Sequence, residues 1–326
     1  MDVKVLDGGF STQLSKHVGE RIDGDPLWTA KFLVTDPHAV LSTHLDFLRA
    51  GSDIIQTNTY QATVTGFVKY LDISERESFS LIHDAVDLAK KAVAIYTEEN
   101  EDAHVVNPKP LIAGSCGPYG AALHDASEYT GSYAKSVSPE MLINWHRPRI
   151  ETLIEAGVDM LALETIPCAN EAEALIELLR DYPETKAWLS FSCRDDGQSL
   201  ADGSNFRETA LKCYRNALPG QILAIGVNCI APKFVSPLLK GINKASQDFV
   251  PLIVYPNSGE KYTVIDGWRF EGNTPPPEHF VHEWLDLGVR YLGGCCRTYA
   301  PTVTRIRTEV ESWQGKKPTH KEKHSE

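Results

Sequence analysis

The residues with the clearest potential for chemistry in this sequence are its thiols. The 326-residue chain contains seven cysteines, and an odd number in a long chain argues against a framework of disulfides. Three of them, Cys229, Cys295 and Cys296, lie just beyond short apolar runs. A thiolate is a ligand for zinc, and three protein ligands leave the fourth position of the ion free for water or a substrate. The thiols therefore predict a catalytic Zn²⁺ site with one ion per chain.

The vicinal pair Cys295-Cys296 needs a turn of the backbone if both sulfurs are to reach one ion. Neighbouring residues of a regular strand point to opposite faces. Gly293 and Gly294 come directly before the pair, and glycine tolerates both a positive φ and a close approach of other atoms. We expect these two glycines to supply the turn.

Other interpretations of the thiols stay open. A vicinal pair of cysteines is also compatible with an inert pair or with a strained, redox-active disulfide. The remaining four cysteines are expected to pack as small apolar residues; they are Cys116, Cys168, Cys193 and Cys213. Cys116 also stands at the end of a predicted strand, so a role as a ligand or substrate contact is open for it.

Eight short apolar segments are predicted to be the strands that position these residues. They lack polar alternation, as expected for strands that are covered on both faces. Their predicted bounds are Val3–Leu6, Ile54–Thr57, Leu111–Ser115, Met160–Leu163, Trp188–Phe191, Leu223–Val227, Leu252–Tyr255 and Tyr291–Gly293.

Helix-like segments with start and stop signals separate the strands. Asp36-Pro37 opens one segment, and Gly51 closes it. Asn170 is predicted to cap a helix over Glu171–Arg180. The helix before the eighth strand is expected to end at Gly288.

The alternation of eight strands with helices predicts a single (β/α)8 TIM barrel over residues 1–314, followed by a polar, disordered tail over 315–326. A doubly wound open sheet is the alternative fold. That fold expects a G-x-G-x-x-G turn after the first strand, and Asp7-Gly8-Gly9-Phe10 does not match it. In a barrel the site is expected at the carboxyl ends of the strands, where the thiols stand.

Composition and charge exclude several classes of protein. Lys and Arg number 32 against 44 Asp and Glu, for a formal charge of −12, which argues against nucleic-acid binding. A hydrophobic content of 42% excludes an intrinsically disordered chain. No apolar run reaches about 18 residues, so no membrane span is expected. No secretory signal is visible either, and we expect a cytoplasmic protein whose thiols stay reduced.

A set of short motifs extends from Asp7 to about Thr304, over nearly the whole chain. The motifs are Asp7–Gly9, Asp25–Trp28, Thr57–Thr63, Gly117–Ala121, His146–Ile150, Glu164–Pro167, Gly226–Cys229, Tyr255–Glu260 and Gly293–Arg297. Their combination resembles the homocysteine S-methyltransferases, a family of zinc-dependent barrel enzymes.

The resemblance implies an activity and a metal. It implies that Cys229, Cys295 and Cys296 are the zinc ligands, and that the thiolate of L-homocysteine accepts a methyl group to give methionine. The motifs are most similar to the branch that uses S-methylmethionine or S-adenosylmethionine as donor. Gln61 and Thr165 stand where the betaine-using relative has tyrosines, which disfavours betaine as the donor.

The resemblance also implies which residues bind homocysteine. Asp7 and Glu164 are expected to receive its amino group, and backbone amides near Gly8 and Gly9 are expected to face its carboxylate. The expected homocysteine site also includes Thr57 and Asn228.

Four aromatic residues are candidates for the donor side of the site. Aromatic faces attract a sulfonium ion by cation–π interaction, and these residues lie in or near the loops that follow strands. They are Trp28, Tyr60, Tyr119 and Tyr255. Packing within the loops is the alternative role for each of them.

Two further functions stay open at this point. One is a non-catalytic zinc-binding or redox-sensing barrel, and the other is a betaine-dependent homocysteine methyltransferase. Arg297 is expected either to bind a carboxylate or to pair with a neighbouring acid. His83, His124 and His146 are expected at the surface or in loops rather than as ligands.

Overall fold

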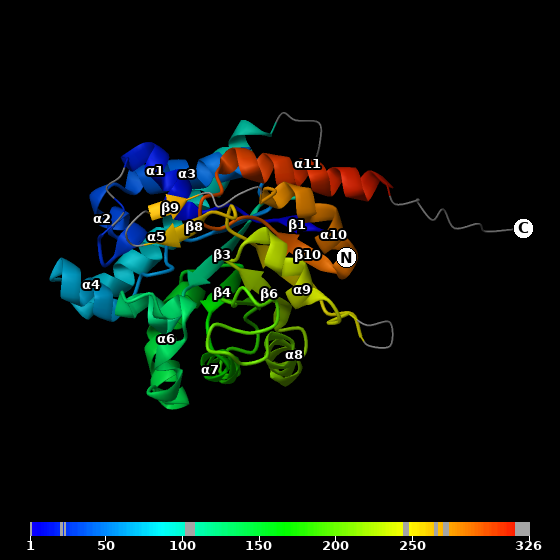
Figure 1. Cartoon of the computed structure of the whole chain (residues 1–326). Coiled ribbons are helices and arrows are strands. Elements are labelled where there is room, and N and C mark those ends of the chain that lie inside the picture. The colour runs from blue at the N-terminus through cyan, green and yellow to red at the C-terminus, as the bar shows by residue number, and fades with distance from the viewer. Residues whose placement is uncertain are drawn as a thin grey trace, which may run out of the picture.

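The computed structural model describes residues 2–19, 22, 24–101, 108–243, 248–263, 267–269 and 274–316. Eight parallel strands pair in the order β1-β10-β7-β6-β5-β4-β3-β2, and helices surround them (Figure 1). A parallel bridge between Leu6 and Ile54 joins the two ends of this order. The sheet therefore closes on itself, which confirms the (β/α)8 barrel and makes the open-sheet alternative wrong.

The eight predicted strands are all present, with small differences at their ends. Their bounds are β1 Lys4–Val5, β2 Ile54–Gln56, β3 Leu111–Cys116, β4 Met160–Ile166, β5 Ala187–Phe191, β6 Ile222–Asn228, β7 Leu252–Tyr255 and β10 Val289–Leu292. Because β4 and β6 extend further than predicted, Glu164, Thr165 and Asn228 are strand residues rather than loop residues.

The α-helices lie between the strands and cover the outside of the barrel (Figure 1). They are α1 Phe10–Val18, α2 Phe32–Thr35, α3 Pro37–Arg49, α4 Val64–Leu71, α5 Glu75–Glu99, α6 Pro139–Glu155, α7 Ala169–Leu179, α8 Phe206–Asn216, α9 Val235–Leu239, α10 Val281–Leu287 and α11 Ala300–Lys316. Helix α11 includes Gly315 and Lys316, two residues that were expected in the tail; residues 317–326 lie outside the described part of the chain.

Two of the predicted helix signals are confirmed and one is wrong. Asp36 caps α3 by accepting a hydrogen bond from the amide of Ala39, and Gly288 ends α10 with φ 108°. Asn170 does not cap α7, because this helix begins at Ala169, two residues before the predicted start. The side-chain amide of Asn170 instead donates to the carbonyl of Ala134 at 2.7 Å.

An antiparallel hairpin that the sequence did not predict follows β7. It consists of β8, Lys261–Thr263, and β9, Gly267–Arg269. Each strand has only three residues, which is shorter than the four- to eight-residue apolar runs that indicate strands.

The inside of the barrel is filled rather than hollow. Trp188 and Tyr255 pack there with small residues of neighbouring strands, including Ala113, Ala162 and Ala224. Alternate residues of each strand point inward, so these alanines leave room for the two large rings. The packed interior closes the floor beneath the carboxyl ends of the strands. Among the helices of the described residues, none is both long and apolar enough to cross a membrane.

Candidate functional site

The three thiols singled out in the sequence come together at the carboxyl ends of β6 and β10. Sγ of Cys229 lies 3.4 Å from Sγ of Cys296, and Sγ of Cys295 lies 4.0 Å from Sγ of Cys296. All three sulfurs lie within 4.8 Å of one another, and all three residues are half-buried. This group, the thiol cluster, is therefore both compact and accessible.

The thiol cluster shares its protons unevenly. Hydrogen bonds from the thiols of Cys295 and Cys296 hold the pKa of Cys229 well below its usual range. The pKa of each donor thiol is raised in turn, first of all by its bond to Cys229. One thiolate among three close sulfurs is a soft, negatively charged group that suits a thiophilic cation.

The backbone turn at the cluster arises differently from the prediction. Neither Gly293 nor Gly294 has a positive φ; Cys229 and Arg297 do, with φ 54° and 63°. The glycines are needed instead for close approach, because a Cβ on Gly294 would lie 2.1 Å from the hydroxyl of Thr298. A Cβ on Gly293 would lie 2.5 Å from the carbonyl oxygen of Asp7.

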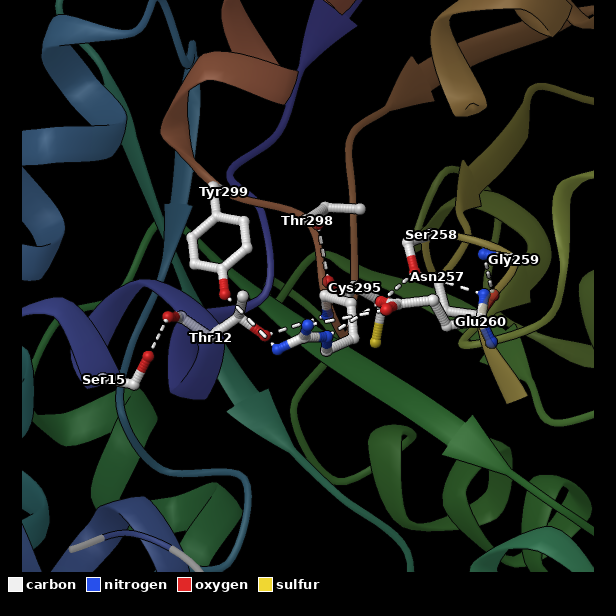
Figure 2. A network of polar contacts seen from close by, with 10 residues as sticks. Thr12, Ser15, Asn257, Ser258, Gly259, Glu260, Cys295, Thr298 and Tyr299 are labelled. Atoms are coloured by element: carbon white, nitrogen blue, oxygen red, sulfur yellow. Dashed lines mark hydrogen bonds and ion pairs between the residues drawn. The ribbon is translucent and has the colours of Figure 1, made fainter. Parts of the chain in front are cut away.

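Arg297 fastens the segment after the thiols to its surroundings. Its Nε donates to Glu260 at 2.8 Å, and its backbone amide donates to the hydroxyl of Thr12 at 2.9 Å. Figure 2 shows Thr12, Glu260 and Tyr299 converging beside Cys295. Of the two roles left open for Arg297, the structure thus has the pairing with a neighbouring acid.

Two buried carboxylates, Asp7 and Glu164, lie at the carboxyl ends of β1 and β4. Burial raises the pKa of Asp7 to about 7, although it accepts hydrogen bonds from the amide and side chain of Gln56 at 2.7 and 3.0 Å. Burial, with a contribution from the charge of Asp7, raises the pKa of Glu164 to about 8. Among the described residues, no Lys or Arg forms an ion pair with either. The pair therefore lacks a cation.

The backbone of Gly8 and Gly9 packs closely against the segment that follows the thiols. A Cβ on Gly9 would lie 2.3 Å from the carbonyl oxygen of Cys295, and a Cβ on Gly8 would lie 2.9 Å from that of Thr298. The amide of Gly9 donates to the carbonyl of Thr298 at 3.0 Å. Both glycines thus stand at the mouth of the barrel, and the Gly9 amide already has an acceptor.

Thr57 and Asn228 also lie at the barrel mouth, but their polar atoms have protein partners. The Thr57 hydroxyl accepts from the amide of Ser115 at 3.0 Å. The Asn228 side chain donates to the hydroxyl of Thr165 at 2.7 Å and accepts from its amide at 2.8 Å. Because Thr165 has φ 60°, these bonds stabilise the backbone directly after Glu164.

The four aromatic candidates differ in their surroundings. The rings of Trp28 and Tyr60 meet edge to face at 6.0 Å, and the Tyr60 hydroxyl is hydrogen-bonded to Thr165. Tyr119 packs its ring against neighbours on the outer side, 5.3 Å from that of Trp145. Tyr255 is buried inside the barrel, where its hydroxyl accepts from the indole of Trp188 at 3.1 Å.

Tyr129 is a site residue that the sequence did not reveal. Its hydroxyl lies 3.6 Å from Sγ of Cys229, and its side chain is exposed. It belongs to a short 3-10 helix, Ser127–Tyr129, in the long connection between β3 and α6. Nothing in the spacing of such a loop indicates which of its residues folds back over the strands.

Two other predictions are corrected or narrowed by the structure. His146 is not at the surface or in a loop: it is fully buried in α6, where Nε2 lies 2.7 Å from Glu171. Cys116 is fully buried outside the thiol cluster, and burial raises its pKa to about 11. His83 lies half-buried in α5, and His124 is exposed.

Known proteins are similar to this chain in sequence and in fold. A family model described as homocysteine S-methyltransferase matches residues 4–310. A betaine-homocysteine S-methyltransferase of Drosophila melanogaster is 50% identical over 315 residues, covering 95% of this chain and 94% of that protein. A homocysteine S-methyltransferase of Escherichia coli K12 is 40% identical over 94% of each chain. The metallated form of the homocysteine methyltransferase MmuM from Escherichia coli superposes with a TM-score of 0.80 at 38% identity, covering 94% of this chain and 96% of that one.

The family match spans nearly the whole chain, and the relatives cover almost their full lengths. The solved relative also has the same fold over almost the whole of both chains. This chain therefore belongs to the homocysteine S-methyltransferase family, whose members are methyltransferases.

Proposed function

We propose that this protein transfers a methyl group from a sulfonium donor, S-methylmethionine or S-adenosylmethionine, to the thiolate of L-homocysteine, giving methionine. The observation that carries this proposal is the meeting of two unlike groups at one barrel mouth. Three thiols lie within 4.8 Å of one another, and two buried carboxylates, Asp7 and Glu164, stand beside them without a Lys or Arg partner in the described part of the chain.

The thiol cluster fits a zinc ion. Tetrahedral zinc with Zn–S bonds of ~2.3 Å separates its sulfur ligands by about 3.8 Å, and the observed separations of 3.4 and 4.0 Å bracket that value. One Zn²⁺ per chain, held by Cys229, Cys295 and Cys296, would supply a Lewis acid that keeps the thiol of homocysteine deprotonated at neutral pH.

The two carboxylates suit the ammonium group of an amino acid. An ammonium ion offers three hydrogen-bond donors and one positive charge, which are what Asp7 and Glu164 lack. The raised pKa of each carboxylate falls again when a cation binds. The free energy of this charge pairing favours an amino-acid substrate over a simple thiol.

The methyl transfer itself needs orientation more than acid–base groups. A bond forms between the homocysteine sulfur and the methyl carbon while the donor C–S bond breaks, and its electron pair stays on a neutral thioether. Correct placement of the two reactants saves roughly 7–11 kcal/mol of the barrier. Tyr60, which lies close enough to the thiol cluster to feel the charge of Cys229, and Trp28, which packs against it, can attract the donor cation by their ring faces.

Betaine is the second candidate donor. The Drosophila relative at 50% identity carries betaine in its name, which favours this alternative. The occupants of positions 61 and 165 favour the sulfonium donors, because Gln61 and Thr165 replace tyrosines of the betaine-using branch. In this chain the Gln61 side chain donates to the carbonyl of Ala121 at 2.9 Å, and Thr165 is held by Asn228.

A redox-sensing role is the remaining alternative, since Cys229 and Cys296 are close together. The methyltransferase proposal places the protein in a reducing compartment such as the cytosol, because zinc-binding thiols must stay reduced. Its partners are then small amino-acid substrates, and it needs neither nucleic acid nor membrane.

A side-by-side kinetic comparison tests the proposal. Zinc-loaded, reduced protein is given homocysteine with S-methylmethionine, S-adenosylmethionine or betaine, and methionine formation is measured. The proposal expects a higher kcat/KM for a sulfonium donor than for betaine. A higher kcat/KM for betaine would make betaine the methyl donor in place of a sulfonium. If no donor gave methionine and only the oxidation state of the thiols changed with reductant, the protein would not be a methyltransferase.

A further inference from the structure

A buried arginine ties together two loops at the mouth of the barrel. Arg149 lies on α6 and is only 2% exposed. Its Nη1 donates to the carbonyl of Tyr60 at 2.8 Å, and its Nη2 donates to the carbonyl of Gly117 at 2.5 Å. Tyr60 follows β2 and Gly117 follows β3, so one helix side chain fixes the start of both loops.

The two loops are also in direct contact with each other. A Cβ on Gly117 would lie 2.6 Å from the carbonyl oxygen of Tyr60 and 2.7 Å from Cε2 of its ring. One edge of the Tyr60 ring, Cδ2–Cε2, therefore lies against a residue without a side chain. The ring also meets that of Trp28 at 6.0 Å. Three contacts, from Arg149, Gly117 and Trp28, together determine where the Tyr60 ring can lie.

The charge of Arg149 is balanced through a relay rather than by a direct ion pair. Its Nη2 lies 3.3 Å from Nδ1 of His146, and Nε2 of His146 lies 2.7 Å from the fully buried Glu171. Since Arg149 can only donate, Nδ1 accepts, so Nε2 carries the proton and donates to Glu171. Burial lowers the pKa of His146, which agrees with a neutral ring. The ring of Trp145 adds a cation–π contact at 5.0 Å.

Burial of a charge costs free energy unless hydrogen bonds replace its lost hydration. The two carbonyls that Arg149 holds do not belong to its own helix; they begin the loops that carry Tyr60 and, further along, Tyr129. Tyr60 is hydrogen-bonded to Thr165, and Tyr129 contacts Cys229. The hydrogen bonds that run from Glu171 through His146 to Arg149 therefore end at the two loops that carry Tyr60 and Tyr129.

We propose that Arg149, supported by His146 and Glu171, is a positioning residue that sets the donor side of the site through Tyr60 and Gly117. This inference rests on the proposed function and goes beyond it. It predicts that loss of Arg149 weakens use of the methyl donor while zinc binding and use of homocysteine stay unchanged. Asp7, Glu164 and the thiols lie at or just beyond the ends of strands, and none of them is a hydrogen-bond partner of Arg149.

The test compares Arg149→Met with Arg147→Met. Arg147 lies two residues away on the same helix but faces outward, where it pairs with Asp181 at 2.8 Å. We expect Arg149→Met to lower the donor kcat/KM by about tenfold, more than loss of the Tyr60 ring alone, because it releases the loops that carry both Tyr60 and Tyr129. Displacement of a positioning group by about 1 Å costs up to about 100-fold. Its zinc content and homocysteine KM should equal those of the wild type, and Arg147→Met should match the wild type in all respects.

Two further variants keep the test decisive if Arg149→Met folds poorly. Arg149→Lys should recover part of the donor kcat/KM, because a lysine can reach one carbonyl but not both. Gly117→Ala keeps the Arg149 side chain but forces the carbonyl and the ring of Tyr60 away from Gly117. Gly117 has no positive φ to complicate the change. This variant should therefore reproduce the donor-specific loss.

Several results would overturn the inference. Donor kinetics at the wild-type level in Arg149→Met and Gly117→Ala would do so, and so would a loss shared equally by zinc content, homocysteine KM and donor KM. A crystal structure of Arg149→Met with the Tyr60 ring in its original place would also overturn it, and this readout does not depend on turnover. Wild-type protein that transfers no methyl group from any donor would instead refute the proposed function.

Discussion

The proposed homocysteine side of the site lies at the ends of strands, whereas the proposed donor side lies in the loops. The homocysteine side consists of Asp7, Glu164 and the thiol cluster, which stand at or just beyond the carboxyl ends of β1, β4, β6 and β10. The donor side consists of Trp28, Tyr60 and Tyr129, which lie outside the barrel strands and the α-helices, in the segments that connect them. Strand ends are held by the hydrogen bonds of the closed barrel, so their geometry is given by the fold.

The loops need additional contacts for the same precision. The position of Tyr60 depends on its contacts with Arg149 and Gly117. The connection between β3 and α6 contains three short 3-10 helices. Substitutions on the two sides should therefore affect different kinetic constants. Changes at strand ends should affect zinc and homocysteine, and changes in loops should affect the donor.

Removal of a thiol should have the largest effect. Loss of a residue that merely supports a metal ligand costs about 10- to 100-fold in metal affinity, so Cys229→Ser, which removes a ligand itself, should lower zinc affinity and methyl transfer by more than about 100-fold. The measurement is metal content by elemental analysis together with methionine formation.

The matched control is Cys213→Ser. Cys213 is buried in α8, away from the thiol cluster, and its substitution should leave zinc content unchanged. Full zinc content and activity in Cys229→Ser would show that Cys229 is not a zinc ligand.

Loss of the Glu164 charge should have the next largest effect. Glu164→Gln keeps the shape of the side chain and can still accept from Ser115, but it loses a charged hydrogen bond worth about 1.5–3 kcal/mol. The homocysteine KM should therefore rise by about 10- to 100-fold. The donor KM should stay unchanged, and an equal rise in both would contradict the separation of the two sides.

The affinity for an amino acid should depend on pH. Burial raises the pKa of Asp7 to about 7 and that of Glu164 to about 8. An ammonium group favours the ionised carboxylates, so binding is strong above pH 8 and is lost as the pH falls through these values. Methionine, which has no thiol proton, should bind at least about tenfold more weakly at pH 6 than at pH 8.5. Calorimetric titration measures this, and a flat profile would show that the carboxylates do not bind the amino group.

A change of the Tyr60 ring should have the smallest effect of these. Tyr60→Leu removes a cation–π contact worth about 0.5–1 kcal/mol at a partly exposed position, so the donor KM should rise roughly two- to fivefold. Steady-state kinetics with each substrate varied in turn would show it. A rise in the homocysteine KM instead would show that Tyr60 belongs to the homocysteine side of the site rather than to the donor side.

The same division explains what could be predicted from the sequence. Short apolar runs predict all eight barrel strands, and a barrel places function at strand ends, so the sequence alone brings Asp7, Glu164 and the three cysteines to one end of the barrel. The turn beside Cys295 and Cys296 is predicted less well. Positive φ occurs at Cys229 and Arg297 rather than at the two glycines before the pair, because local backbone conformation depends on contacts that a pattern does not contain.

The loop-borne residues could not be predicted in the same way. The contact between Tyr129 and Cys229 joins residues 100 positions apart. The hydrogen bond from Arg149 to Tyr60 spans 89 positions. A loop has no periodicity that fixes the direction of its side chains, so these contacts follow only from the folded chain. The prediction of a surface position for His146 is wrong for the same reason, since its partner Glu171 lies on another helix.

We propose above all that the three thiols hold a zinc ion whose fourth coordination position receives the sulfur of homocysteine. Zinc K-edge X-ray absorption of the loaded, reduced protein tests it most directly, because this measurement counts the sulfur neighbours of the metal. We predict three sulfur ligands in the free protein and four after addition of homocysteine. A sulfur count that does not change on addition of homocysteine would contradict the account.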